Sequence, residues 1–387
     1  MRDTTARPPI QGAAPLARIR TLLARLHDDG TARDRAGNRQ LFYDQYVGLL
    51  LLYFFNPTLT RLNALRQATD LDSVQRWLGL PKRVSIGSLS EAAGVFDPDL
   101  LRGLLTELAA QVAPTALPDD RDALRHLTAV DGTLLPVLPR LAHTLWGDAG
   151  RLSAKLHLHF EVGRGIPVDA TVTPAASSEI APLRGALQAN RLYVTDRGYA
   201  SYRLLADILA AGSSFVARLR GDAAFRGAER EVPAPARAAG VVRDVTVDRL
   251  GVGADVLGRA VRVVVVRPEP GDGRSDTPLV LVTDQLHLSA ELVALAYRWR
   301  WQIELFFRWL KCVLGCRHLL SHDVDGITIQ IYVALIASVL LGAAGGRTPT
   351  KRTYEMFCHF VSGWATAEEV QRHLEGLKAK RAPPSKA

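Results

Sequence analysis

The chain has 387 residues, 48 basic and 39 acidic side chains, and a formal net charge of +9. Hydrophobic residues make up 48% and charged residues 22% of the chain, which is typical of a folded globular protein and excludes disordered and fibrous classes. Three cysteines exclude a disulfide scaffold and favour a reducing compartment. The positive charge favours a polyanionic partner such as nucleic acid.

Residues 1–118 are predicted to form a helical domain. Apolar residues recur there at helical spacing over 16–26, 43–55, 59–68 and 100–112. A basic loop with Lys82 and Arg83 follows the third segment, and Ser88 and Glu91 have the spacing of a capping box at a helix start. Such a loop suits either phosphate groups or a solvated helix end, and both readings stay open.

From residue 119 the pattern changes to strands. Strands are predicted over 127–135, 153–162, 167–173, 192–195 and 214–219, and helices over 179–189 and 201–211. A strand hairpin followed by strand–helix crossovers is the ribonuclease H-like order. We therefore predict an α/β domain with a mixed five-stranded sheet over 119–220, resumed over 287–345.

Residues 221–286 are predicted to be a β-rich subdomain inserted into that domain. Strands are expected over 241–248, 260–267 and 278–283, separated by turns rich in Gly, Asp and Pro. After the insertion, Ser289 is expected to cap one long helix that runs to about Leu314. Residues 346–387 are predicted to be a helical C-terminal region suited to dimerisation.

Two features bear on the membrane. The N-terminus lacks the apolar segment of a signal peptide. The run 327–345 is about long enough to cross a bilayer, but Thr328, Gln330 and Ser338 interrupt it. We predict a buried core helix and no membrane partner.

The helix after the insertion gathers charged and aromatic side chains on one side. On a helical wheel, an arc of about 100° holds two aromatic residues, three cations and one carboxylate, namely Tyr297, Arg300, Trp301, Glu304, Arg308 and Lys311. An ordinary solvated face explains the Glu304–Arg308 spacing but not the whole group. Arg, Lys and aromatic side chains in one row suit phosphates and unstacked bases.

Two further carboxylates, Asp131 and Asp196, are predicted to lie at strand ends, where sites of open sheets form. Each alone is also compatible with an ordinary turn or helix cap. With Glu304 they make a candidate carboxylate triad. Hard oxygen ligands suit Mg²⁺ or Mn²⁺, and two such ions can support an in-line phosphoryl displacement.

The pattern Tyr297-(2)-Arg300-(3)-Glu304-(6)-Lys311 resembles the Y-(2)-R-(3)-E-(6)-K motif of DDE transposases from bacterial insertion sequences. That family includes the transposon five and transposon ten enzymes. The residues around Asp131 and around Asp196 are similar to the family's first and second catalytic motifs. The resemblance covers roughly residues 80–345.

The resemblance implies roles for these side chains. Asp131, Asp196 and Glu304 would be the catalytic residues and would hold two Mg²⁺ or Mn²⁺ ions. The residues implied to contact DNA are Tyr297, Arg300, Trp301, Arg308 and Lys311, with Trp301 placed against a distorted transposon end.

The activity implied is DNA transposition. The enzyme would cleave phosphodiester bonds at the ends of an insertion sequence and join the 3′ hydroxyls to target DNA by two-metal-ion phosphoryl transfer. Its implied partners are double-stranded DNA with terminal inverted repeats, target DNA and a second copy in a synaptic homodimer, in the bacterial cytoplasm at the nucleoid. The N-terminal domain would bind the DNA end. Two alternatives remain: an inactive or domesticated DNA-binding relative, and a ribonuclease H-like nuclease without strand transfer.

Overall fold

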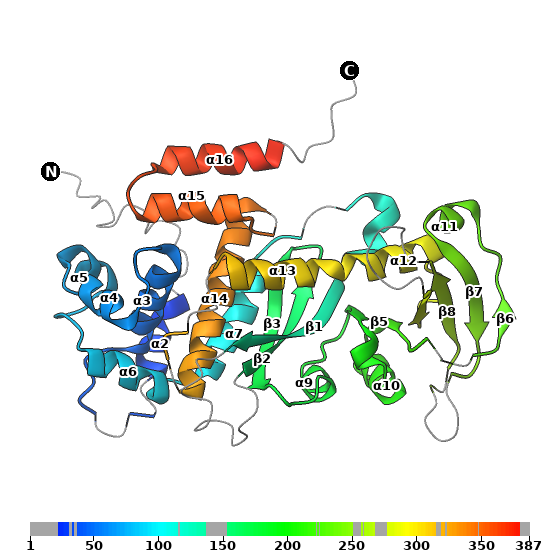
Figure 1. Ribbon diagram of the computed structural model, residues 1–387, viewed down its shortest axis with the longest axis horizontal. Helices are drawn as coiled ribbons and strands as arrows, with labels where there is room; N and C mark the ends of the chain where they lie inside the picture. The colour runs from blue at the N-terminus through cyan, green and yellow to red at the C-terminus, as the bar shows by residue number, and fades with distance from the viewer. Residues whose placement is uncertain are drawn as a thin grey trace. The chain divides into compact units, whose positions relative to one another are not determined.

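The computed structural model describes residues 22–30, 33–34, 37–114, 117–136, 153–221, 223, 225–250, 257, 259–267, 277–314, 319–321, 323–346 and 348–379. The chain divides into two compact units (Figure 1). The first unit comprises Met1–Ala113, Leu135–Ala154 and Arg308–Ala387. The second comprises Pro114–Leu134 and Lys155–Phe307.

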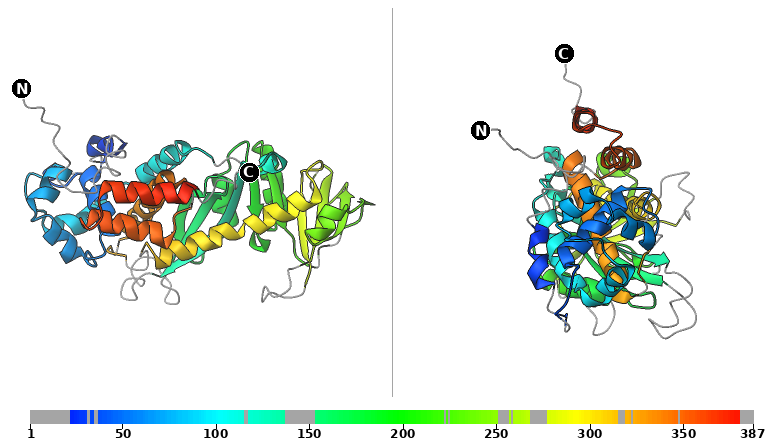
Figure 2. Two further views of the ribbon diagram at one scale, coloured as in Figure 1. Left: turned by 90° about the horizontal axis from the view of Figure 1, so that it is seen from above. Right: turned by 90° about the vertical axis from the view of Figure 1, so that its left-hand side faces the viewer.

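The first unit is built from helices around a central apolar helix. These are α2 (Leu26–Asp29), α3 (Tyr43–Phe55), α4 (Leu62–Ala68), α5 (Asp72–Leu78), α6 (Ile86–Val95), α7 (Pro98–Ala110), α14 (Val324–Gly345), α15 (Lys351–Val361) and α16 (Ala367–Ala379). Helix α14 packs against α3, α6, α7, α15 and α16, and α15 and α16 lie side by side (Figures 1 and 2).

Helix α14 is the run that has the length and apolar composition of a membrane span, and within the described residues it is the one helix that does. Its side chains are buried almost all round, including Gln330 and Ser338. A helix that is apolar on every side is what a core helix surrounded by other helices requires. The burial is therefore that expected of a core helix.

Local capping sets where α6 and α7 begin. The predicted start of α6 at Ser88 is wrong, because Ser85 is the N-cap residue and its hydroxyl accepts a 2.9 Å hydrogen bond from the Ser88 backbone N–H. The chain thus uses the earlier of two serines with a suitable side chain. Asp97 caps α7, whose first residue is Pro98. Proline suits that position because it has no N–H to leave unpaired.

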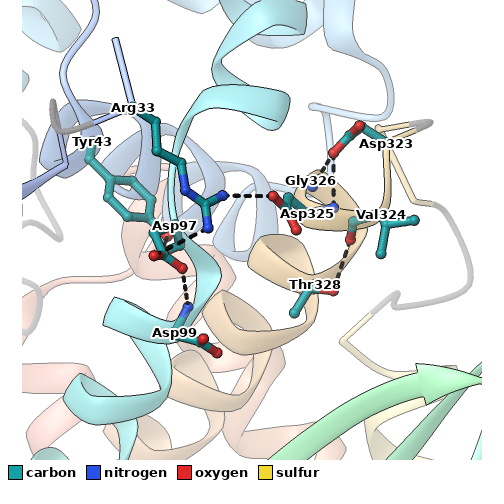
Figure 3. A network of polar contacts seen from close by, with 9 residues as sticks. All are labelled: Arg33, Tyr43, Asp97, Asp99, Asp323, Val324, Asp325, Gly326 and Thr328. Carbon is teal, nitrogen blue, oxygen red and sulfur yellow. Dashed lines mark hydrogen bonds and ion pairs between the residues drawn. The ribbon is translucent and has the colours of Figure 1, made fainter.

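An arginine joins the N-termini of two helices of the first unit (Figure 3). Arg33 donates a 2.8 Å hydrogen bond to the Asp325 carboxylate in the first turn of α14, and its guanidinium lies 3.2 Å from the Asp97 carboxylate. The Tyr43 hydroxyl donates to the Asp97 backbone carbonyl at 2.9 Å. Both carboxylates lie at helix N-termini, where negative charge is favourable, and Arg33 links them.

A nine-stranded mixed sheet organises the second unit. Its strands are β1 (Leu127–Pro136), β2 (Ser153–Glu161), β3 (Ile166–Pro174), β4 (Leu192–Thr195), β5 (Ser214–Arg218), β6 (Ala228–Glu229), β7 (Val241–Val247), β8 (Val261–Val266) and β9 (Leu279–Thr283). Their order is β3-β2-β1-β4-β5-β9-β8-β7-β6. β1, β4 and β5 are parallel neighbours, whereas β5, β9, β8, β7 and β6 pair antiparallel.

The prediction of a five-stranded sheet is wrong, because the sheet formed by the described residues has nine strands. The strands expected in the insertion are present, but they continue the same sheet. β9 pairs with β5 through Val216↔Thr283 and Arg218↔Leu281. The physical reason is that β5 would otherwise present an edge of unpaired backbone N–H and C=O groups.

Helices cover both faces of this sheet. They are α9 (Ile180–Gly185), α10 (Tyr202–Ala210), α11 (Ala234–Ala238) and α12 (Ala290–Trp299), with 3₁₀ turns at η1 (Asp119–Leu124) and η2 (Arg197–Tyr199). Leu183 of α9 and Ile208 of α10 share a core with Tyr193 of β4 and Phe215 of β5. Helix α12 contacts β4, β5, β7, β8 and β9, on the side opposite α9 and α10 (Figure 1).

Candidate active site

Adjacent parallel strands bring Asp131 and Asp196 together. β1 and β4 pair through Leu127↔Leu192 and Ala129↔Val194, and the same register continued for two residues places Asp131 opposite Asp196. Asp196 directly follows β4, as predicted. Asp131 lies inside β1 rather than at its end, which corrects the prediction. The neighbouring strand β4 ends at Thr195, one residue before the position opposite Asp131. Strand β4 therefore does not extend past the Asp131 side chain.

The helix that carries the Tyr297–Lys311 motif is divided in two at Arg300, where one continuous helix was predicted. Helix α12 ends at Trp299 and α13 (Trp301–Cys312) follows. Backbone hydrogen bonds from Arg300 to Tyr297 and from Ile303 to Arg300 each span three residues. This 3₁₀-type spacing tightens the helix locally without reversing its direction, because Arg300 keeps helical angles of φ −52° and ψ −32°.

Arg300 connects the motif helix to the sheet. Its guanidinium donates to the Glu304 carboxylate at 2.6 Å and to the Asp131 carboxylate at 3.3 Å. The same group lies 5.6 Å from the centre of the Tyr297 ring, a cation–π distance. Two of the three candidate acids, far apart in the chain, therefore share one buried cation.

The electrostatics of Asp131 indicate that Asp196 and Glu304 both lie within electrostatic range of its carboxylate. The pKa of Asp131 is raised from its ordinary 3.8 to about 6, chiefly by burial and also by the nearby Asp196 and Glu304 carboxylates. Arg300 and the Gly132 backbone N–H act in the opposite direction. The result is a partly buried group of acids with incomplete charge compensation, an arrangement that favours binding of additional cations.

Sequence reasoning missed two residues at this site. The Glu179 carboxylate, directly before α9, pairs with the Lys155 ammonium of β2 at 2.7 Å. Tyr199 follows Asp196 by three residues; its hydroxyl is buried and has no hydrogen-bond partner among the described residues. Burial, followed by Glu179 and Asp131, raises the pKa of Tyr199 above its ordinary value. The sequence feature that could have indicated close neighbours at this site is the glycine after each aspartate, Gly132 after Asp131 and Gly198 after Asp196.

The acids fit a divalent metal by donor chemistry, since carboxylate oxygens are the ligands that Mg²⁺ and Mn²⁺ prefer. Within the part of the chain that the structure describes, no three His, Cys, Asp or Glu side chains come close enough together to hold a metal ion. Arg300 stands between Asp131 and Glu304 instead. The residue types and the negative charge therefore suit a divalent metal ion. In this structure, Asp131 and Glu304 both pair with the Arg300 guanidinium.

The residues predicted to contact DNA differ in exposure. Tyr297 and Arg300 are buried, Trp301 is 39% exposed and Arg308 is exposed. Arg308 and Lys311 lie further along α13, in the part of that helix that belongs to the first unit. The six residues of the predicted arc are thus not one uniformly exposed surface, because Tyr297 and Arg300 turn into the protein.

The chain is similar in sequence to proteins of a known family. The family model described as "Transposase DDE domain" matches residues 122–340. A Sinorhizobium fredii protein named "Putative transposase y4zB" is 27% identical over 227 residues, 58% of this chain and 62% of that protein. The "Probable transposase for insertion sequence element IS5377" of Geobacillus stearothermophilus is 25% identical over 295 residues, 76% of this chain and 74% of that protein.

A solved structure of piggyBac transposase in a synaptic complex with hairpin DNA gives a TM-score of 0.42 at 10% identity, covering 96% of this chain and 86% of that chain. That likeness is too weak to support an argument about fold or function. The family match, in contrast, spans more than half of the chain. The chain belongs to the DDE transposase domain family.

Proposed function

We propose that this chain is a DNA transposase that cleaves phosphodiester bonds at the ends of an insertion sequence and joins the freed 3′ hydroxyls to target DNA. The observation that carries the proposal is the meeting of Asp131 and Glu304 on Arg300, beside Asp196, in a chain of the DDE family. The match covers 62% of the Sinorhizobium fredii relative, so the activity of the whole protein is inferred from the site as well.

In this proposal Asp131, Asp196 and Glu304 hold two Mg²⁺ or Mn²⁺ ions. When bound, such ions supply activation of the attacking oxygen and stabilisation of the leaving oxygen. The chain's own contribution is position, because β1 and β4 fix the two aspartates side by side. Arg300 holds Glu304 toward Asp131 and is a donor for a DNA phosphate.

The sheet supports a ribonuclease H-like catalytic domain. The first five strands lie in the order β3-β2-β1-β4-β5; Asp131 belongs to the central strand β1, and Asp196 directly follows the neighbouring strand β4. We assign residues 119–220 and 287–345 to this domain, 221–286 to an insertion, 1–118 to DNA-end binding and 346–387 to a region suited to dimerisation.

The proposed partners are transposon ends with terminal inverted repeats, target DNA and a second copy of the chain, in the bacterial cytoplasm at the nucleoid. Trp301 and Arg308 are exposed on α13, as DNA contacts require. Tyr297, Arg300 and Lys311 are assigned to phosphates near the cleaved bond. A hairpin intermediate would give Trp301 an unpaired base to stack on.

The test is a cleavage and strand-transfer assay with DNA that carries the repeats flanking the gene. We expect nicking and joining that require Mg²⁺ or Mn²⁺ and stop with EDTA. Glu304→Gln keeps the side-chain size and removes the charge, and it is expected to lower the cleavage rate by at least about 10³-fold while end binding persists.

Other outcomes point to the alternatives. Specific end binding without cleavage in any metal would replace the proposal with an inactive DNA-binding relative. Cleavage without a joined product would indicate a nuclease that lacks strand transfer. Cleavage by Glu304→Gln at the wild-type rate would refute the assignment of the triad.

A further inference from the structure

A second ion pair lies between the two aspartates' backbone segments. Glu179 and Lys155 come from the residue before α9 and from β2. Their side chains are only 27% and 15% exposed, and their charged atoms are 2.7 Å apart. The Lys155 ammonium also reaches the Ser177 backbone carbonyl at 3.5 Å, so it is held by two groups of the Glu179 segment.

The Glu179 carboxylate lies against two glycines. A Cβ atom placed on Gly132, the residue after Asp131, would lie 3.2 Å from Glu179 Oε1 and 3.2 Å from Lys155 Cε. A Cβ atom placed on Gly198, two residues after Asp196, would lie 3.0 Å from Glu179 Oε2. Because a side chain at either position would crowd the carboxylate, both glycines provide the room that Glu179 occupies.

One carboxylate thus lies close to both aspartate segments, with Oε1 nearer Gly132 and Oε2 nearer Gly198. The segment of Asp196 is further tied down by its own carboxylate, whose Oδ1 accepts a 2.8 Å hydrogen bond from the Gly198 N–H. The segment of Asp131 is tied in the same way through the Gly132 N–H at 2.8 Å. Glu179 therefore lies against the very glycines that orient the two catalytic carboxylates.

We propose that Glu179, held by Lys155, is a positioning residue that fixes the spacing of the Asp131 and Asp196 carboxylates for phosphoryl transfer. The inference rests on the proposed function and deepens it, since it concerns the same site. Lys155 also prevents Glu179 from adding to the negative charge there. The four carboxylates Asp131, Asp196, Glu304 and Glu179 are accompanied by two cations, Arg300 and Lys155, so the group keeps a formal net charge of −2 that favours arriving cations.

The experiment compares wild type with Glu179→Gln, Lys155→Met and the double variant. We expect each single variant to lower the cleavage rate of the preassembled end complex by about 10- to 100-fold, because a misplacement of about 1 Å at reacting groups has that effect. The dissociation constant for the DNA end should stay within about twofold. The double variant should be no slower than the slower single variant, since the two side chains act as one pair.

A measurement independent of activity accompanies the rates. Binding of Mn²⁺ to the full chain without DNA, followed by electron paramagnetic resonance, should weaken in Glu179→Gln. The matched control is Asp207→Asn, which breaks the Arg184–Asp207 ion pair on the α9–α10 side of the same unit. That pair touches neither glycine, and the control should retain both the cleavage rate and Mn²⁺ binding.

The outcomes separate this inference from the proposed function. If wild type does not cleave under any condition, the proposed function fails. If wild type cleaves and Glu179→Gln cleaves equally fast, the positioning role is refuted. It is also refuted if Glu179→Gln loses end binding and thermal stability in proportion to its rate, since that would be the effect of a purely structural ion pair.

Discussion

Two aspartates of the same sheet, Asp244 and Asp131, are in opposite electrostatic situations. In its outer strands, Asp244 of β7 is 1% exposed and pairs with Arg262 of β8 through two hydrogen bonds of 2.8 and 2.6 Å. Arg230 adds a third contact at 3.8 Å. In the central strands, Asp131 has one guanidinium contact at 3.3 Å, and that guanidinium is shared with Glu304.

We interpret this as the difference between a structural acid, Asp244, and a proposed catalytic acid, Asp131. Two arginines, Arg262 and Arg230, lie near the single Asp244 carboxylate, so its negative charge is compensated within the fold. Asp131 is partly buried among other acids with too little compensation, and its pKa rises to about 6 for that reason. An uncompensated buried carboxylate costs stability, and proteins retain such groups at sites where a ligand supplies the missing charge.

The largest expected effect on stability comes from removing the Asp244 carboxylate. Asp244→Ala leaves the Arg262 guanidinium buried without its partner, and we expect a loss of about 3–5 kcal/mol in the free energy of unfolding. Urea denaturation measures it. Asp207→Asn, at a partly exposed pair, should lose no more than about 1 kcal/mol and is the control. A loss below about 1 kcal/mol for Asp244→Ala would contradict the comparison.

Removing the charge of Asp131 should have the opposite effect on the free energy of unfolding and stabilise the protein. Because the pKa of Asp131 is higher in the folded protein than its ordinary 3.8, this group's contribution to stability declines as pH rises from about 4 through 6. Asp131→Asn should therefore raise the free energy of unfolding by about 3 kcal/mol at pH 8 and by almost nothing near pH 4. Denaturation of both proteins at several pH values tests this. Equal differences at all pH values would refute it.

The buried His157 offers a third case beside Asp244 and Asp131, because burial favours its neutral form. His157 of β2 is 3% exposed and its Nε2 lies 2.8 Å from the Thr173 hydroxyl. Burial, aided by Lys155, lowers the pKa of His157 to about 4. Since the unfolded chain protonates near 6.5, this group removes stability as pH falls from about 6.5 to 4.

We expect wild type to lose about 2 kcal/mol between pH 8 and pH 5 that His157→Gln does not lose. The measurement is again the free energy of unfolding at the two pH values. The result that would oppose this account is an unchanged pH slope in the variant.

Local pattern predicted most of the elements. Helix α3 was predicted over 43–55 and β4 over 192–195, and both have those bounds. The reason is that apolar periodicity and breakers such as Asn56-Pro57 act within a few residues of the backbone they shape. The start of α6 was missed by three residues because two serines offered a cap and only the packed helix selects one.

The sequence by itself determined the class of this protein. The class could be read without coordinates from two aspartate motifs and one spaced helical motif, carried by Asp131, Asp196, Tyr297, Arg300, Glu304 and Lys311. The tertiary structure alone decided that the later strands extend the sheet, that Arg300 lies between two acids, and that Glu179 lies against Gly132 and Gly198. These are contacts between residues far apart in the chain. Strand pairing and charge compensation depend on which distant groups the fold brings within hydrogen-bond reach, and no local pattern encodes that choice.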